Sequence, residues 1–152
     1  MYQRYCNHGQ PQSVFIIYKD GKVDLQKITD VYNIKDFKNV KLAVGGIGLR
    51  NTLDNTFKYN PAAEGFKGTY ADVLRKTNKT VIGYSKITGK VYLLAVRNIT
   101  HGDLIKLIST GEEYDIALSL DGGGSTFMDA SKQYVFEGQN SRRIHNIIGF
   151  GL

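Results

Sequence analysis

Short apolar runs that end at glycines or polar pairs recur along the chain and predict β-strands. Residues 13–18 form an apolar, β-branched run, an Asp-Gly pair supplies hairpin-turn chemistry, and residues 22–28 continue with alternating character. Residues 80–85 and 90–97 repeat this arrangement around a Thr-Gly turn. The pattern therefore predicts two β-hairpins, one near the N-terminus and one in the middle of the chain.

One amphipathic helix is predicted after the second hairpin. Apolar residues repeat at helical spacing across residues 104–108, Thr100 or Asp103 can cap the start, and Gly111 stands just past the end. The histidine at position 101 is then part of the helix start. An apolar run at 114–120 follows and has the pattern of a buried strand.

The remaining segments complete a chain of short strands and one long loop. Residues 40–44 predict a strand that runs into a glycine cluster, which we expect to be a loop that brings backbone amides close to a ligand. Residues 50–79 are polar and irregular, with a short helical segment predicted at 70–76. Because long loops in compact domains usually carry function, we expect this one to cover the substrate. Residues 133–136 and 144–150 add C-terminal strands.

The length and composition indicate one folded α+β domain that covers residues 1–152. A chain of 152 residues can bury about two-thirds of its extended surface around a single core. The lone Cys6 cannot form an internal disulfide, residues 1–10 lack the apolar stretch of a secretory signal, and no run approaches the roughly 18 apolar residues needed to span a bilayer. We therefore expect a cytoplasmic protein with no membrane partner.

The basic charge suggests an anionic ligand without identifying one. The formal net charge of +6 comes mainly from lysines spread over residues 19–90. Such a field attracts phosphorylated ligands, and a solvated lysine-rich surface gives the same composition. Because the chain has no dense basic run or basic helix, nucleic acid is not the expected partner. A homo-oligomer is compatible with the sequence, which leaves the oligomeric state open.

The most informative motif is the polar turn that follows the predicted strand at 114–120. Asp121 precedes three glycines, Ser125 and Thr126. Glycines expose backbone amides, and the carboxylate and hydroxyls add directional polar contacts, so the turn can cradle an anion. It matches neither a Walker loop nor a Rossmann fingerprint. A tight glycine turn between two strands is the structural alternative for the same residues.

This segment, ALSLDGGGSTFM at residues 117–128, resembles the signature of the phosphodiester glycosidase family. KTVIG at 79–83 resembles the family's Arg-Thr-Ala-Ile-Gly strand, and RRIHN at 142–146 resembles its closing Arg-Arg-Val-x-Asn segment. The chain departs from the family pattern at 44–48, where VGGIG replaces Asn-Gly-Gly-Phe-Phe, and at Lys79, which replaces an arginine. The resemblance implies a mixed β-sheet with one or two packed helices. It also implies cleavage between a sugar's anomeric carbon and a phosphodiester.

The motif and the resemblance together select candidate site residues and a small phosphorylated ligand. Asp121 suits proton transfer or the binding of a divalent cation beside the phosphate, and these alternatives stay open. Arg143 suits phosphate binding, and His145 lies near it in sequence. The cofactor is unknown apart from that cation, and the scattered histidines predict no zinc site. The predicted ligand-binding residues are Gly45, Gly46, Lys79, Thr80, Gly122, Gly123, Gly124, Ser125, Thr126, Arg142 and Asn146.

Three functions are compatible with such a pocket. In the first, the protein is a hydrolase in which the glycine-rich turn stabilises phosphate charge beside Asp121. In the second, it is a binding protein that sequesters a nucleotide or cyclic nucleotide signal without turnover, as a phage-encoded sponge would. A third interpretation is a phage-particle domain that grips a phosphodiester polymer such as wall teichoic acid.

Overall fold

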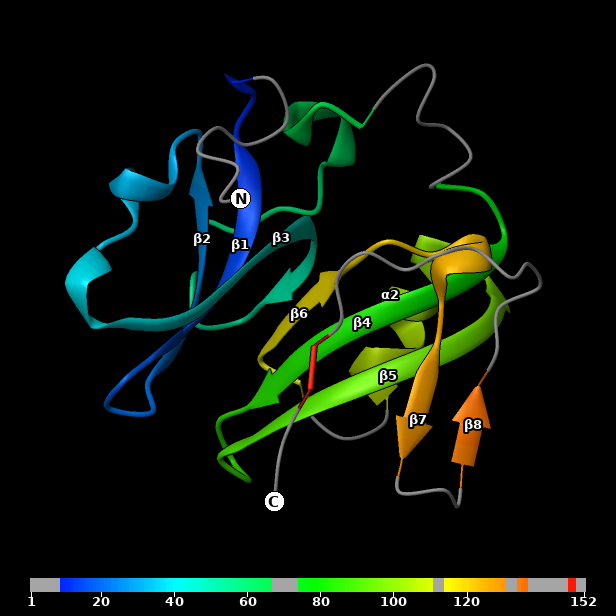
Figure 1. The fold of residues 1–152 in the computed structure, drawn as a ribbon. Helices are drawn as coiled ribbons and strands as arrows, with labels where there is room; N and C mark the ends of the chain where they lie inside the picture. The colour runs from blue at the N-terminus through cyan, green and yellow to red at the C-terminus, as the bar shows by residue number, and fades with distance from the viewer. Residues whose placement is uncertain (1–8, 67–73, 111–113, 131–133, 137–147, 150–152) are drawn as a thin grey trace.

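In the described part of the chain, the protein is built around one six-stranded sheet with a 10-residue helix against it (Figure 1). The computed structural model describes residues 9–66, 74–110, 114–130, 134–136 and 148–149. The strands of the main sheet are β1 (Gln12–Tyr18), β2 (Val23–Ile28), β3 (Val40–Asn51), β4 (Thr77–Ser85), β5 (Lys90–Ile99) and β6 (Ile116–Ser119). The other elements are helix α2 (His101–Thr110), the strand pair β7 (Met128–Ala130) and β8 (Tyr134–Phe136), and the 3₁₀ turns η2 (Val31–Asn33), η3 (Phe37–Asn39), η4 (Pro61–Glu64) and η6 (Gly123–Ser125).

The two predicted hairpins and the predicted helix are confirmed. Strands β1 and β2 pair as one hairpin and β4 and β5 as the other. Helix α2 begins with a reciprocal pair of hydrogen bonds, in which the Asp103 amide donates to the Thr100 hydroxyl and that hydroxyl donates to the Asp103 carboxylate. The turn chemistry and the helical period are local signals, and the fold follows both of them.

The prediction of a mixed sheet is wrong, because every strand pair in the described part of the chain is antiparallel. The strand order is β2-β1-β3-β6-β4-β5. Strand β6 enters between β3 and β4 and runs antiparallel to both. The crossover through α2 therefore connects two parallel strands, β5 and β6, that are not neighbours in the sheet.

The predicted loop at the glycine cluster is also wrong, because Gly45 and Gly46 lie inside the 12-residue strand β3. The first half of β3 pairs with β1, where Ser13 lies opposite Gly46, and the second half pairs with β6. The three backbones converge where β3 changes partner, and a Cβ atom on Gly46 would lie 2.3 Å from the Ser119 carbonyl oxygen. Close packing accounts for this glycine, and ligand binding at Gly45 and Gly46 stays a prediction.

Alternation along β4 and β6 divides the core into two layers and positions the candidate site. Val81 and Ala117 belong to the cluster that includes Leu104 of α2, whereas Ile82 belongs to the layer on the opposite face. Side chains two residues apart in a strand share a face. Lys79 and Ser119 therefore lie on the face that α2 covers, and Thr80 lies on the other.

The long segment between β3 and β4 contains a short turn instead of being entirely irregular. Strand β3 extends to Asn51, η4 follows at Pro61–Glu64, and β4 begins at Thr77. Residues 70–73 of the predicted helical segment lie outside the described residues, as do Gly111 and most of the predicted strand at 144–150. Strand β8 confirms the strand predicted near residues 133–136.

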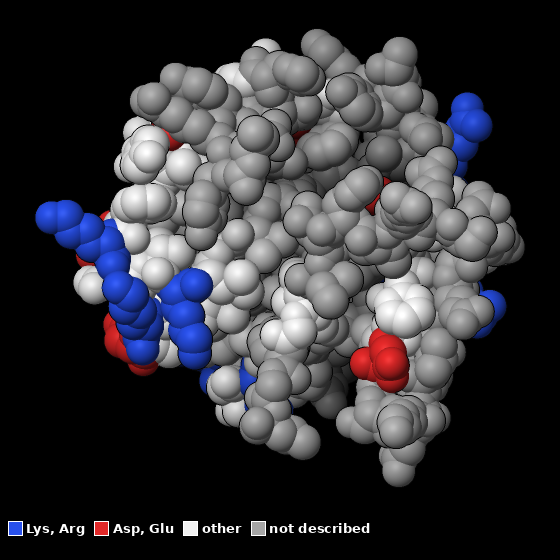
Figure 2. Space-filling model, viewed as in Figure 1, with Lys and Arg blue, Asp and Glu red and all other residues white. Residues whose placement is uncertain are grey.

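The described surface carries its basic side chains mixed with acidic ones. On the face shown in Figure 2, many of the lysines and arginines lie at the left edge, in the region of the β1–β2 hairpin, with acidic side chains beside them, and others lie at the right edge. The hairpin turn itself presents exposed Lys19, Asp20 and Lys22. This arrangement is that of a solvated surface. No helix among the described residues has the length and apolar character needed to cross a membrane.

Candidate functional site

The glycine-rich turn leaves the end of β6 and packs directly against the start of β4. The Leu120 amide donates to the Thr80 carbonyl at 2.8 Å. A Cβ atom on Gly122 would lie 2.5 Å from the Asn78 carbonyl oxygen, and Gly123 has a φ of +61°, which favours glycine. The structure thus brings Thr80 and the Asp121 turn together, and the close contact at Gly122 explains a glycine there.

Asp121 is the exposed residue at the start of this turn. Its Oδ1 atom accepts a hydrogen bond of 2.9 Å from the Gly122 amide, so the carboxylate caps the turn and stays open to solvent. Thr126 at the far end is fully buried. The hydroxyls of Thr126 and Thr80 are buried without a hydrogen-bond partner in the described part of the chain. The turn is therefore bordered by two hydroxyls that no described residue pairs.

Lys79 lies next to the turn through its backbone, and its side chain is buried. The side chain is 2% exposed, and its ammonium donates to the Arg75 carbonyl at 2.9 Å and to the Thr77 hydroxyl at 2.8 Å. A buried ammonium supplies positive potential to its surroundings, but it does not offer the open, paired donors of an arginine fork. Lys79 thus contributes charge to the region from below the surface.

A chain of polar side chains that the sequence analysis missed lies beside Lys79. His101, the first residue of α2, has Nε2 at 3.1 Å from the Ser119 hydroxyl and Nδ1 at 3.1 Å from the Tyr59 hydroxyl. The Tyr59 and His101 rings meet edge to face. Ser119 stands two residues before Asp121, on the face of β6 that α2 covers. Because residues two apart in a strand share a face, strand alternation offered a signal for it. Tyr59 lies in an aperiodic loop and offered none.

Desolvation favours the neutral forms of both His101 and Tyr59. Desolvation, reinforced by the positive charge of Lys79, lowers the pKa of His101 to about 4. Desolvation and then the negative charge of Glu64 raise the pKa of Tyr59. At neutral pH the imidazole therefore has one donor nitrogen and one acceptor nitrogen.

The lowered pKa of His101 predicts a loss of stability in mild acid. An imidazole that titrates near pH 6.5 in the unfolded chain and near pH 4 in the folded protein binds more protons when unfolded. Stability is then complete above pH 6.5 and falls as the pH drops toward 4. Between pH 7.5 and pH 5 we expect a loss of about 2 kcal/mol from this group. Urea unfolding at both pH values measures it.

The control for this prediction is His101→Gln, which cannot titrate. The variant should be less stable at pH 7.5 but should lose about 2 kcal/mol less than the wild type on going to pH 5. Lys79, Tyr59 and Ser119, the groups that face the imidazole from β4, the loop and β6, are retained in this comparison. Equal losses in both proteins would show that other groups cause the acid sensitivity.

The remaining predicted site residues cannot be placed beside the turn. Arg142, Arg143, His145 and Asn146 lie outside the described residues, so their roles stay predictions. Among the residues that the structure describes, no three His, Cys, Asp or Glu side chains form a metal-binding group. A divalent cation at Asp121 also stays a prediction.

Comparison with known proteins assigns the fold and the turn to one family. The family model described as phosphodiester glycosidase matches residues 1–151. The protein therefore belongs to the phosphodiester glycosidase family, as the motif at 117–128 indicated. A search of curated proteins gives no match.

Solved structures share the fold at low sequence identity. One is the zebrafish N-acetylglucosamine-1-phosphodiester alpha-N-acetylglucosaminidase catalytic domain, auto-inhibited by its pro-peptide, with a TM-score of 0.60, 20% identity and coverage of 80% of this chain and 43% of that one. Another is a hypothetical protein from Synechocystis, with a TM-score of 0.54, 15% identity and coverage of 88% and 32%. The chain thus spans less than half the length of either structure.

Proposed function

We propose that the protein binds a sugar-1-phosphodiester or nucleotide-like ligand at the turn of residues 121–126 and hydrolyses the bond between the sugar and the phosphate. The observation that carries the proposal is the packing of the family signature. The turn lies against the start of β4, with Asp121 exposed at its entrance and the backbone of Asn78 and Lys79 next to Gly122. A ligand at Asp121 would therefore meet a carboxylate and the backbone amides of the glycine-rich turn together.

The chemistry assigns a separate task to each part of the turn. In the reaction the bond between the anomeric carbon and the phosphate oxygen breaks, a water oxygen bonds to that carbon, and the phosphate takes a proton. Amides near Gly123 suit the phosphate oxygens, because turn amides point toward anions. Asp121 suits proton transfer at the sugar end, since carboxyl groups commonly act as general acids or bases. These assignments make Asp121 the residue whose loss should stop turnover.

Sequestration without turnover is the second candidate, and the geometry of Lys79 favours it. Two protons of its ammonium are donated to Arg75 and Thr77, so the side chain does not reach out to clamp a phosphate. If backbone amides bind the phosphate tightly and Lys79 does not contact it, a nucleotide signal would stay bound without being cleaved. The two candidates share one proposed site, the turn of residues 121–126, and differ in whether the ligand survives.

The decisive experiment incubates the full chain with sugar-1-phosphodiesters, nucleotides and cyclic nucleotides, with and without a divalent cation, and separates the mixture by chromatography before and after heating. Asp121→Asn keeps the shape of the side chain and an acceptor for the Gly122 amide. We expect it to lower turnover by about 100-fold or more, the usual contribution of a general acid or base. Asp129→Asn, at an exposed aspartate of β7, is the matched control and should keep wild-type turnover.

Each outcome separates the candidates. New products that Asp121→Asn fails to form support the hydrolase. Products formed equally by Asp121→Asn would remove Asp121 from the mechanism. Ligand that disappears from solution and returns intact on heating would replace the hydrolase with a sequestering protein.

A further inference from the structure

The polar chain through His101 ends at the peptide from which the Asp121 turn begins. Tyr59 comes from the loop between β3 and η4, His101 from the start of α2, and Ser119 from the end of β6. The Ser119 hydroxyl also donates to the Leu120 carbonyl at 3.4 Å. Since the Leu120 amide is already bonded to Thr80, both peptide groups that flank Leu120 are held in place.

The number of protons available decides the direction of the hydrogen bonds. A serine hydroxyl has one proton, and the Leu120 carbonyl can only accept. If Ser119 donates to that carbonyl, His101 Nε2 must donate to Ser119, and the neutral ring then accepts at Nδ1 from Tyr59. Each hydrogen bond in the chain is then donated toward the Leu120 carbonyl: from Tyr59 to His101, from His101 to Ser119 and from Ser119 to Leu120. In the opposite tautomer Nε2 would accept a hydrogen bond from Ser119. The single Ser119 proton would then no longer be donated to the Leu120 carbonyl.

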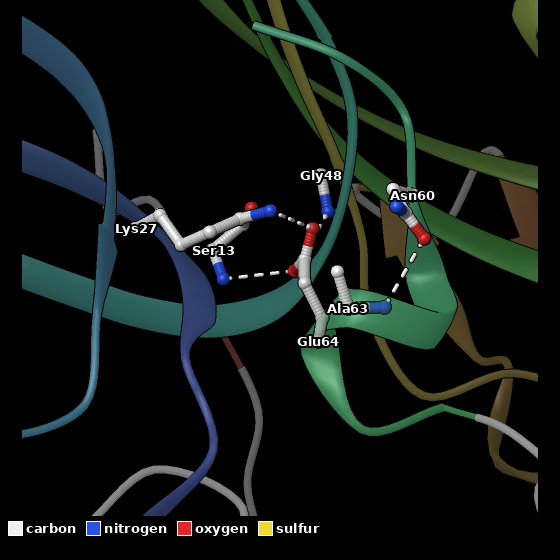
Figure 3. Close-up of polar contacts among 6 residues, drawn as sticks. All are labelled: Ser13, Lys27, Gly48, Asn60, Ala63 and Glu64. Atoms are coloured by element: carbon white, nitrogen blue, oxygen red, sulfur yellow. Dashed lines mark hydrogen bonds and ion pairs between the residues drawn. The ribbon is translucent and has the colours of Figure 1, made fainter.

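Tyr59 is able to act in this way because its loop is pinned to the sheet. Glu64, five residues further on, is fully buried, and its Oε2 accepts a hydrogen bond of 2.9 Å from the Ser13 amide of β1 (Figure 3). The Asn60 side chain caps η4 by accepting from the Ala63 amide at 3.1 Å. The Tyr59 side chain is 37% exposed, so the chain of hydrogen bonds starts at the surface and ends at the turn.

We propose that Tyr59 is a positioning residue of the site. Its hydroxyl holds neutral His101 as the Nε2–H tautomer, and through Ser119 this orients the Leu120 carbonyl from which the Asp121 turn starts. The tautomer and the orientation of the peptide stand on the contacts alone. The consequence for catalysis rests on the proposed function.

The test is Tyr59→Phe, which removes the hydroxyl and keeps the ring. The full chain is prepared with isotope-labelled histidine, and long-range proton–nitrogen spectra report which ring nitrogen is protonated. His101 is assigned among the three histidines by its absence in His101→Gln. We expect an Nε2–H ring in the wild type and a mixture of tautomers in Tyr59→Phe. Backbone amide signals of residues 120–122 should shift with it.

The matched control is Tyr92→Phe in strand β5. It removes a tyrosine hydroxyl that bonds to Thr88 in the turn between β4 and β5. It should leave the His101 tautomer and the amides of residues 120–122 unchanged. With a substrate that the wild type cleaves, Tyr59→Phe should lower turnover about five- to tenfold, the effect of about one hydrogen bond, with KM nearly unchanged.

Two results would overturn the inference. One is an Nδ1–H ring in the wild type, and the other is a His101 spectrum that Tyr59→Phe leaves unchanged. If the wild type cleaves nothing, the proposed function fails, and the tautomer and amide signals still decide whether Tyr59 positions the turn.

Discussion

Glu64→Ala is expected to lower the free energy of unfolding by about 3 kcal/mol, since it deprives several buried groups of their acceptor. The Glu64 side chain is 0% exposed and lies where β1, β2 and β3 meet the loop that carries η4. Its Oε2 accepts from the Ser13 amide at 2.9 Å and, at a longer 3.5 Å, from the Gly48 amide, while Oε1 lies 3.5 Å from the Lys27 ammonium (Figure 3).

The expected loss comes mainly from the amides and less from the ion pair. A buried amide that loses its acceptor costs about 1–3 kcal/mol. Glu64→Ala removes the acceptor of the Ser13 amide, and it also removes the longer contact from the Gly48 amide. Lys27 is 39% exposed, so water can solvate its ammonium once the carboxylate has gone. The alanine also leaves a cavity at the junction of loop and sheet.

Two variants separate these contributions in urea unfolding. Glu64→Gln keeps an acceptor oxygen and removes the charge, so it should be less destabilising than alanine. Lys27→Met removes the ion pair and keeps the carboxylate bonded to the amides, so it should destabilise the protein less than Glu64→Ala does. If Lys27→Met were as harmful as Glu64→Ala, the ion pair and not the amides would hold the loop.

The local parts of this fold could be predicted from the sequence because their signals lie within a few residues. The β1–β2 and β4–β5 hairpins carry their own turn chemistry, and α2 carries its period and its capping pair at Thr100 and Asp103. Strand order and direction depend instead on contacts between distant segments. For this reason the insertion of β6 between β3 and β4, which makes the sheet antiparallel, left no trace in the local pattern.

The candidate site was likewise predictable only where its residues are close in sequence. The Asp121 turn was visible as a motif, because the residues that form it are consecutive. The Tyr59–His101 contact joins residues 42 positions apart, and neither residue stands in a recognisable pattern. Glycine runs are ambiguous in a further respect, since the same residues serve open loops and crowded strands. At Gly46 the crowding atom belongs to Ser119, which the local sequence does not reveal.

Gly46→Ala is expected to destabilise the protein by about 3 kcal/mol, toward the upper end for overpacked cores. The added Cβ atom would lie 2.3 Å from the Ser119 carbonyl oxygen and 3.0 Å from two side-chain atoms of Leu118. A flexible side chain could move aside, but a carbonyl in the centre of the sheet cannot move without β6. The strain should therefore separate β3 from β6 at the point where β3 changes partner.

Gly102→Ala provides the matched control, because the same methyl group is added at a site with space. The nearest atom to a Cβ there is the Thr100 hydroxyl oxygen at 3.8 Å, and alanine is favoured over glycine in a helix by up to about 1 kcal/mol. The two variants should shift the urea midpoint in opposite directions. A destabilisation of Gly46→Ala below about 1 kcal/mol would show that β6 gives way easily.

The strain at Gly46 should also reach the candidate site, since the crowded carbonyl belongs to the residue that receives the hydrogen bond from His101. Displacing β6 at Ser119 moves its hydroxyl away from Nε2, so Gly46→Ala should perturb the His101 ring signals and the amides of residues 120–122. Gly102→Ala adds its methyl group next to His101 without touching Ser119 and should leave those amides in place. Perturbation by Gly46→Ala alone would show that the glycine in β3 and the turn at Asp121 belong to one packed unit.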